Sequence, residues 1–299
     1  MMDRPSSPKR RLAWLRRGLA AGLLAGAAAV GLIWTQQERL LFHPQPLPAD
    51  FSFAGRYAPE QAFEELHIPV DGAELHALLF RQPASRGLVF YLHGNSGNLV
   101  EWTSNVAFYR RLGFDLFIFD YRGFGKSSGH IDGEAQLHAD VRAAWEHIAP
   151  AYAGRPAVIL GRSLGSGLAV RLARDVHPDL LVLVSPYASL RQLAHEHYPL
   201  VPAALLKYPL ASDRLIGAVT SPVLILHGGR DALIPAAHAR ALVAASGGRA
   251  ELVEVDGAGH DDIHRFAAYA DGLARRVDRL AAGPDAGAAL SAPPRSSRP

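Results

Sequence analysis

Six short apolar runs, separated by stretches with helical periodicity, constrain the fold of this chain more than any other feature. Each run is apolar on both faces, as the strands of a parallel sheet covered by helices must be. The runs are GLVFYLHG (87–94), DLFIFDYRG (115–123), PAVILGRS (156–163), LLVLVSPY (180–187), PVLILHGG (222–229) and AELVEVDG (250–257). Helix-period apolar residues occupy 98–112, 133–149, 165–176, 236–246 and 262–280. This alternation predicts an α/β fold with a doubly wound, mostly parallel sheet.

An antiparallel hairpin is predicted ahead of the parallel strands. FEELHIPV (63–70) and AELHALLF (73–80) are separated by Asp71-Gly72, a preferred hairpin turn. The stretch 187–219 is longer than a usual strand connection and rich in Leu, His, Tyr and Pro, so we expect a short lid insertion there. The domain should extend over 63–280. The tail, 281–299, has too few large apolar residues to bury and should be disordered.

The segment 18–34, GLAAGLLAGAAAVGLIW, carries no charge. As a helix it would cover about 25 Å, slightly less than a hydrocarbon core of roughly 30 Å. The long side chains of Arg16 and Arg17 can extend along the helix and cover the difference. We interpret 18–34 as a retained transmembrane anchor. A signal peptide cleaved near Ala27 and Ala29, and a buried helix, are the alternatives.

Positive charge is concentrated ahead of this segment. Residues 1–17 carry a net charge of +5, which leaves the rest of the chain at −2 out of a total of +3. The basic arm predicts a cytoplasmic N-terminus and a catalytic domain on the periplasmic or other extracytoplasmic side. The acidic remainder gives no support for nucleic-acid binding. After the anchor, ERLLFHPQPLP holds three prolines, so we expect 35–62 to be an extended collar or linker rather than a helix.

Gly18, Gly22 and Gly26 lie four residues apart on one face of the predicted anchor. This spacing lets two membrane helices approach closely, which predicts a weak homodimer through these glycines. A Gly/Ala-rich helix without a partner is the simpler alternative, because small residues are common in such helices.

GRSLG at 161–165 matches the G-x-S-x-G pattern and stands between a predicted strand and a predicted helix. A sharp strand-to-helix turn leaves little room for side chains beside its serine. Gly161 and Gly165 would allow the backbone to cross there, while Ser163 projects above the sheet edge. Since a serine hydroxyl must lose its proton as it attacks, Ser163 requires a nearby base.

The base and its acid are predicted in the loops that follow two later strands. His260 lies in DGAGHDDI, after the last strand, and Asp231 lies in LHGGRDALIP, after the preceding strand. The chain order Ser163, Asp231, His260 is that of a hydrolase triad. Other acids stand close to His260 in the sequence, but only Asp231 follows its own strand; these rivals are Asp256, Asp261 and Asp262.

An acyl-transfer enzyme also requires two N–H donors for the oxyanion of its tetrahedral intermediate. We expect them to be the backbone N–H of Leu164, after the nucleophile, and that of Asn95 in the loop YLHGNSGN. His93 in the same loop is a possible base, but its place before a turn glycine favours a structural hydrogen bond.

Other chemistries find less support in the sequence. The chain has no cysteine, so it offers neither a thiolate zinc site nor a cysteine nucleophile. The HEH sequence at 195–197 places its two histidines on opposite faces of a strand or about 200° apart on a helix, so no metal site is expected. GFGKSS lacks the spacing of a phosphate-binding loop. We expect no cofactor.

HGNSGN, DYRGFGKSSG, GRSLGSG, HGGRDALIP and GAGH together resemble the α/β-hydrolase superfamily. Within this superfamily the chain is similar to the serine-aminopeptidase-like and monoacylglycerol-lipase-like branch, and to its membrane-anchored α/β-hydrolase-domain proteins with a single N-terminal span. The resemblance covers about residues 40–280. It implies that Asp120 and Arg122 brace the nucleophile loop. Many relatives carry another residue at Asn95, so the resemblance supports its backbone donor and not its side chain.

The function that we expect is hydrolysis of carboxylic esters or thioesters with lipid-like or other acyl groups, through an acyl-enzyme. The resemblance also admits a serine peptidase acting on short peptides. Such a peptidase needs a site for a charged terminus, for which the predicted lid offers Glu196, Lys207, Asp213 and Arg214. A non-catalytic binding protein of the same fold is the third alternative.

Overall fold

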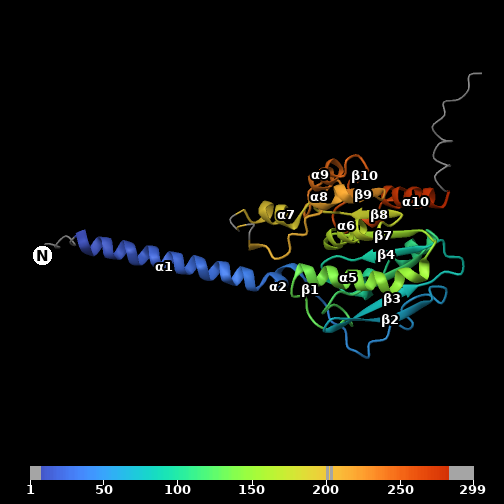
Figure 1. The fold of residues 1–299 in the computed structure, drawn as a ribbon, viewed down its shortest axis with the longest axis horizontal. Coiled ribbons are helices and arrows are strands. Elements are labelled where there is room, and N and C mark those ends of the chain that lie inside the picture. The colour runs from blue at the N-terminus through green and yellow to red at the C-terminus, as the bar shows by residue number, and fades with distance from the viewer. Residues whose placement is uncertain (1–7, 200–201, 203–204, 283–299) are drawn as a thin grey trace, which may run out of the picture.

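The computed structural model describes residues 8–199, 202 and 205–282 (Figure 1). Its main sheet has eight strands in the order β10-β9-β8-β7-β4-β6-β3-β2. Their bounds are β2 (Phe63–Val70), β3 (Ala73–Phe80), β4 (Leu88–Leu92), β6 (Asp115–Phe119), β7 (Ala157–Arg162), β8 (Leu180–Val184), β9 (Val223–Gly228) and β10 (Ala250–Val255). The six apolar runs of the sequence form β4 and β6 to β10, which pair in parallel, as predicted.

The antiparallel part of the sheet is confined to one edge. β2 pairs with β3, and β3 pairs with β6, both in antiparallel register. The turn between β2 and β3 has Gly72 at φ +70°, a conformation that glycine adopts without strain. β2 and β3 therefore form the hairpin that Asp71-Gly72 indicates.

Helices cover both faces of the sheet. α5 (Glu134–Ile148), α6 (Leu164–Val176) and α9 (Ala237–Ala245) contribute to the core on one face. α4 (Val106–Arg111) and α10 (Ala267–Ala282) contribute to the core on the other. The helix expected over 98–112 is broken into α3 (Leu99–Trp102) and α4, because Thr103 to Asn105 form a turn between them. The last helix begins later than expected, after a short 3-10 turn, η4 (Ile263–Arg265).

The predicted lid, 187–219, carries two short helices and a 3-10 turn: α7 (Leu190–His197), α8 (Ser212–Leu215) and η3 (Ile216–Ala218). A further 3-10 turn, η1 (Ala149–Tyr152), follows α5. The side chain of Ser189 caps α7 by accepting a hydrogen bond from the N–H of Gln192. α7 extends beyond the sheet on the side from which the N-terminal helix leaves the domain (Figure 1).

The N-terminal part of the chain departs from expectation in two places. α1 (Pro8–Thr35) is one helix, so residues 8–17 of the basic arm and the segment 18–34 are continuous. It projects away from the domain (Figure 1), and Arg16–Thr35 is the one stretch in the described residues that is long and apolar enough to span a membrane. Moreover, α2 (Gln37–Leu41) follows at once, so the first part of the expected extended collar is helical.

The helical start of the collar has a simple cause. Its prolines begin only at Pro44, which leaves the backbone of QERLL free to form a turn of helix. Gln37 and Phe42 are each only 4% exposed, so packing against the domain stabilises this turn. Beyond it, β1 (His43–Pro44) is extended and pairs in parallel with β5 (Ser96–Gly97). The predicted disordered tail falls almost wholly outside the described residues, which end at 282.

Candidate active site

Ser163 lies between the end of β7 and the start of α6. Its backbone has φ +51° and ψ −119°, a region that non-glycine residues rarely occupy. Its N–H donates to the carbonyl of Val184 at 2.9 Å, which holds the turn on the neighbouring strand. A β-carbon at Gly161 would lie 2.4 Å from the carbonyl oxygen of Gly165, and one at Gly165 would lie 2.2 Å from that of Leu92. Both predicted glycines are thus required by close backbone contact.

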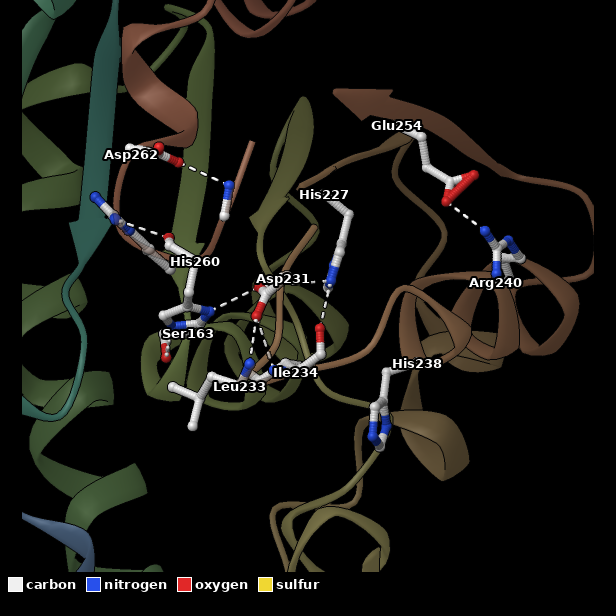
Figure 2. A network of polar contacts seen from close by, with 12 residues as sticks. Ser163, His227, Asp231, Leu233, Ile234, His238, Arg240, Glu254, His260 and Asp262 are labelled. Carbon is white, nitrogen blue, oxygen red and sulfur yellow. Dashed lines mark hydrogen bonds and ion pairs between the residues drawn. The ribbon is translucent and has the colours of Figure 1, made fainter. Parts of the chain in front are cut away.

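The three predicted triad residues form a chain of hydrogen bonds (Figure 2). Nε2 of His260 lies 3.0 Å from Oγ of Ser163, and Nδ1 of His260 lies 2.7 Å from Oδ2 of Asp231. The side chains come from the loops after β7, β9 and β10, which the sheet order places next to or near one another. This arrangement allows His260 to accept the serine proton at Nε2 while Asp231 orients the ring through Nδ1.

Asp231 is held as a carboxylate by its own loop. Its other oxygen, Oδ1, accepts hydrogen bonds from the N–H groups of Leu233 at 3.0 Å and Ile234 at 2.8 Å. Burial acts to raise the pKa of Asp231, but the hydrogen bonds from His260 and Ile234 outweigh it and the net pKa lies below 3.8. Nε2 of His227 donates a hydrogen bond to the carbonyl of Ile234, 2.8 Å away, and so supports the same turn.

Two residues hold the His260 loop: Arg162, which the sequence did not single out, and Asp262, which it offered only as a rival acid. Nη2 of Arg162 donates to the carbonyls of His260, at 3.2 Å, and Asp261, at 3.1 Å. The Arg162 guanidinium also lies over the ring of Trp102, 5.4 Å from its centroid. Asp262 accepts from the N–H of Gly259 at 2.7 Å (Figure 2). The signal for Arg162 was its position next to the nucleophile, but nothing local shows that it reaches a loop about a hundred residues away.

The two predicted oxyanion donors flank Ser163. The N–H groups of Asn95 and Leu164 have no protein acceptor among the described residues. Asn95 and Gly94 line the same cavity as Ser163 and His260, which has a volume of about 300 Å³. The side chain of Asn95 does not point to this task, because its Nδ2 donates to the carbonyl of Leu41 at 2.8 Å. The backbone N–H of Asn95 is therefore the group of this residue that is available to an oxyanion.

His93 has a structural position beneath this loop, as its place in the sequence indicates. It is fully buried, and its Nδ1 lies 2.7 Å from the carbonyl of Gly94. Burial lowers the pKa of His93 to about 4, so the ring is neutral at physiological pH. Nε2 of His93 lies 3.6 Å from Oδ1 of Asp120. Burial raises the pKa of Asp120 well above its usual value.

The expectation that Asp120 and Arg122 brace the nucleophile loop is wrong, because the contacts of both side chains lie elsewhere. Asp120 accepts a hydrogen bond from the N–H of Leu99 at 3.3 Å. It therefore supports the start of α3, directly after the loop 93–98. Arg122 forms a buried, two-pronged ion pair with Asp140 of α5, with distances of 2.6 and 2.8 Å. It also donates to the carbonyl of Asp71, so it fastens the hairpin turn to α5.

The HEH sequence of the lid makes protein contacts. Glu196 accepts a hydrogen bond from Nε2 of His238 in α9 at 3.0 Å, and Nε2 of His197 lies 2.9 Å from the carbonyl of Leu233. Within the described part of the chain, no group of three or more His, Cys, Asp or Glu side chains is arranged to hold a metal ion. These contacts join the lid to the loop that carries Asp231.

Comparisons with known proteins identify the family of this chain. Residues 83–212 match the family described as serine aminopeptidase, S33. An uncharacterised protein of Mycobacterium tuberculosis is 34% identical over 246 residues, which cover 80% of this chain and 85% of that protein. Alpha/beta hydrolase domain-containing protein 17C of Xenopus tropicalis is 34% identical over 194 residues, covering 64% of this chain and 61% of the relative.

Solved structures show the same fold at lower identity. An esterase of Pyrococcus furiosus superposes with a TM-score of 0.64 at 18% identity, covering 80% of this chain and 97% of the esterase. A thioesterase domain from the curacin biosynthetic pathway superposes with a TM-score of 0.54 at 14% identity, covering 73% of this chain and 99% of that domain. With its fold, its sequence relatives and its serine-bearing turn, the chain belongs to the α/β-hydrolase superfamily, in the monoacylglycerol-lipase-like branch that includes the serine aminopeptidase family.

Proposed function

We propose that this hydrolase cleaves carboxylic esters or thioesters with Ser163 as nucleophile, His260 as general base and Asp231 as the orienting acid. The observation that carries the proposal is the continuous chain from Oγ of Ser163 through both ring nitrogens of His260 to Asp231, with distances of 3.0 and 2.7 Å. Its members come from three separate loops, and their roles follow from these contacts.

The reaction proceeds in two halves. Oγ of Ser163 attacks the substrate carbonyl while its proton passes to Nε2 of His260, and the resulting oxyanion accepts hydrogen bonds from the N–H groups of Asn95 and Leu164. His260 then protonates the leaving alkoxide or thiolate, which departs and leaves an acyl-serine. In the second half water attacks this ester while His260 takes its proton; the bond between the acyl carbon and Oγ then breaks, His260 returns the proton to Ser163, and the acid is released.

Acyl substrates such as lysophospholipids or lipid-modified proteins fit best with the proposed membrane location. We propose that Arg16–Thr35 anchors the chain as a single span, with the N-terminus in the cytoplasm and the domain outside it. Dimerisation through Gly18, Gly22 and Gly26 stays a prediction. Peptidase activity finds less support, because two lid candidates for binding a charged terminus are paired within the protein, Glu196 with His238 and Lys207 with Glu38.

The proposal is tested with a fluorophosphonate probe on the full chain and on Ser163→Ala. We expect labelling of the unmodified protein alone, and a loss of about 10⁶ in p-nitrophenyl ester turnover in the variant. Esters from two to sixteen carbons and aminoacyl-nitroanilides would define the substrate class. Equal ester turnover by both proteins would refute Ser163 as nucleophile, and cleavage of anilides alone would favour the peptidase alternative.

A further inference from the structure

The first part of the collar, residues 37–47, lies directly against residues 93–98, the loop that carries the predicted oxyanion donor Asn95 and is called here the oxyanion loop. The N–H of His43 donates to the carbonyl of Asn95 at 2.8 Å. The side-chain Nδ2 of Asn95 donates back to the carbonyl of Leu41, also at 2.8 Å. Residue 95 is therefore held by the collar through both its backbone and its side chain.

The neighbouring residues extend this contact into a small parallel sheet. β1 of the collar pairs with β5 of the oxyanion loop, in the register His43 to Ser96 and Pro44 to Gly97. The N–H of Gln45 donates to the carbonyl of Gly97 at 3.1 Å, and Nδ2 of Asn98 donates to the carbonyl of Gln45 at 2.9 Å. The contact thus continues along the loop from Asn95 to Asn98.

The collar is itself fixed to the domain on its other side. The carboxamide of Gln37 donates to the carbonyl of Leu205 at 2.6 Å and accepts from the N–H of Lys207 at 2.8 Å. The ring of Phe42 is buried and meets Tyr208 edge to face, with centroids 5.2 Å apart. These contacts belong to the returning arm of the lid, so the collar joins the lid to the oxyanion loop.

We propose that the collar is a positioning element of the active site, which sets the direction of the Asn95 N–H toward the oxyanion. The inference rests on the proposed serine hydrolase function. The oxyanion loop contains Gly94 and Gly97, and a glycine-rich backbone has many accessible conformations. An oxyanion donor contributes only when it is already aimed at the developing charge. The contacts from the collar supply this restraint from outside the loop.

A single backbone hydrogen bond can be removed to test this inference. His43→Pro deletes the N–H that Asn95 accepts from, and the preceding residue, Phe42, already has φ −114° and ψ +128°, which a following proline permits. The matched control is His43→Ala, which keeps the N–H and removes only an exposed side chain. Both variants are made in the full chain, and thermal unfolding verifies that each is folded.

We expect His43→Pro to lower kcat for a short p-nitrophenyl ester by about 10- to 100-fold, since small displacements of catalytic groups have effects of this size. KM should change little. A boronic acid that forms a tetrahedral adduct with serine should bind more weakly by the same factor as kcat falls. A purely structural role of the collar would change the unfolding temperature without this parallel loss. His43→Ala should match the unmodified protein within about twofold.

Asn95→Ala provides a second, independent variant, because it removes the side-chain bond to Leu41 and keeps the backbone N–H. It should show the same parallel loss of kcat and boronic acid affinity. Unchanged kcat in folded His43→Pro and Asn95→Ala would overturn the positioning role while the hydrolase function stands. If the unmodified chain neither reacts with a fluorophosphonate nor hydrolyses esters, the proposed function itself fails, and the positioning role fails with it.

Discussion

The partners of Ser163 in the triad, Asp231 and His260, and the loop 93–98 that carries Asn95 are held by different kinds of contact. Asp231 and His260 follow strands of the main sheet, and each is fixed by hydrogen bonds within its own loop or to a neighbouring loop of the same edge. Asn95 is fixed by a segment that precedes the domain. Loops at the edge of the sheet therefore hold Asp231 and His260, whereas a segment that precedes the domain holds Asn95.

The largest effect is expected on the triad side. Asp231→Asn should lower kcat about 10⁴-fold at neutral pH, because an amide cannot hold the His260 ring in the required tautomer. KM for a short ester should stay nearly constant. Steady-state kinetics at pH 7 test this, and a loss below about tenfold would mean that another acid orients His260.

The same variant has a pH signature in stability. Since the pKa of Asp231 is lower in the folded chain than its ordinary 3.8, ionised Asp231 stabilises the fold at higher pH. This contribution is lost as the pH falls through the folded-state pKa. Urea unfolding of the unmodified protein and Asp231→Asn should therefore differ most above about pH 5, and the difference should shrink as the pH falls below 3.8. A gap that widens with acid would contradict the depressed pKa.

The turn that carries Ser163 should be next in sensitivity. Gly165→Ala places a methyl group 2.2 Å from the carbonyl oxygen of Leu92, and the three atoms nearest to it are all backbone atoms of Leu92 and His93, which cannot turn aside as a side chain can. We expect the free energy of unfolding to fall by about 3 kcal/mol, with a large loss of activity. Gly133→Ala, where a β-carbon meets nothing within 4 Å, is the control and should cost less than about 1 kcal/mol. Equal stability of the two variants would show that α6 can shift off β4.

A smaller effect is expected from removing the hydrogen bonds that Arg162 donates to the His260 loop. Arg162→Met retains much of the packing on Trp102 but leaves the carbonyls of His260 and Asp261 without their charged donor. Losing such bonds should reduce kcat/KM about tenfold. Arg142→Met is the control, since Arg142 forms an exposed pair with Glu146 on α5. If both variants keep full activity, the His260 loop holds its geometry without Arg162.

The smallest effect should come from the ion pair between the collar and the lid. Glu38 contacts Lys207 at 3.1 Å and accepts from the hydroxyl of Tyr208 at 3.0 Å. Because these groups are partly exposed, Glu38→Gln should lower the free energy of unfolding by about 1 kcal/mol or less and leave kcat for a short ester unchanged. Chemical denaturation and ester kinetics measure the two quantities. A large fall in kcat would show that the contacts of Glu38 with the lid also take part in the positioning role of the collar.

The parts of the fold and site that could be predicted from sequence are those encoded locally. A strand, a sharp turn and a helix around Ser163 occupy contiguous residues, and the order of Asp231 and His260 follows from the order of the strands. The turn at Gly72 is equally local. Arg122 was misplaced because its partner, Asp140, lies on α5 and is specified by tertiary packing. The helix α2 was missed because the prolines that follow it dominated the pattern.

The contact of Asn95 with Leu41 is the clearest case of information that a local pattern does not contain. It joins a side chain to a backbone carbonyl 54 residues earlier, and every residue type has such a carbonyl. No periodicity or motif therefore marks Leu41 as a partner. The same holds for Arg162, whose acceptors are also carbonyls.

The junction between α1 and α2 has a consequence for where the reaction can take place. One residue, Gln36, separates the two helices, and Phe42 is already buried in the domain. With α1 inserted in a bilayer as proposed, no flexible linker separates the membrane helix from the domain. Ser163 would therefore stay at a nearly constant distance from the lipid surface. The protein would then select substrates by the distance between their scissile acyl bond and the membrane surface. Short insertions after Gln36 should shift that preference in membrane-bound substrates and leave soluble esters unaffected.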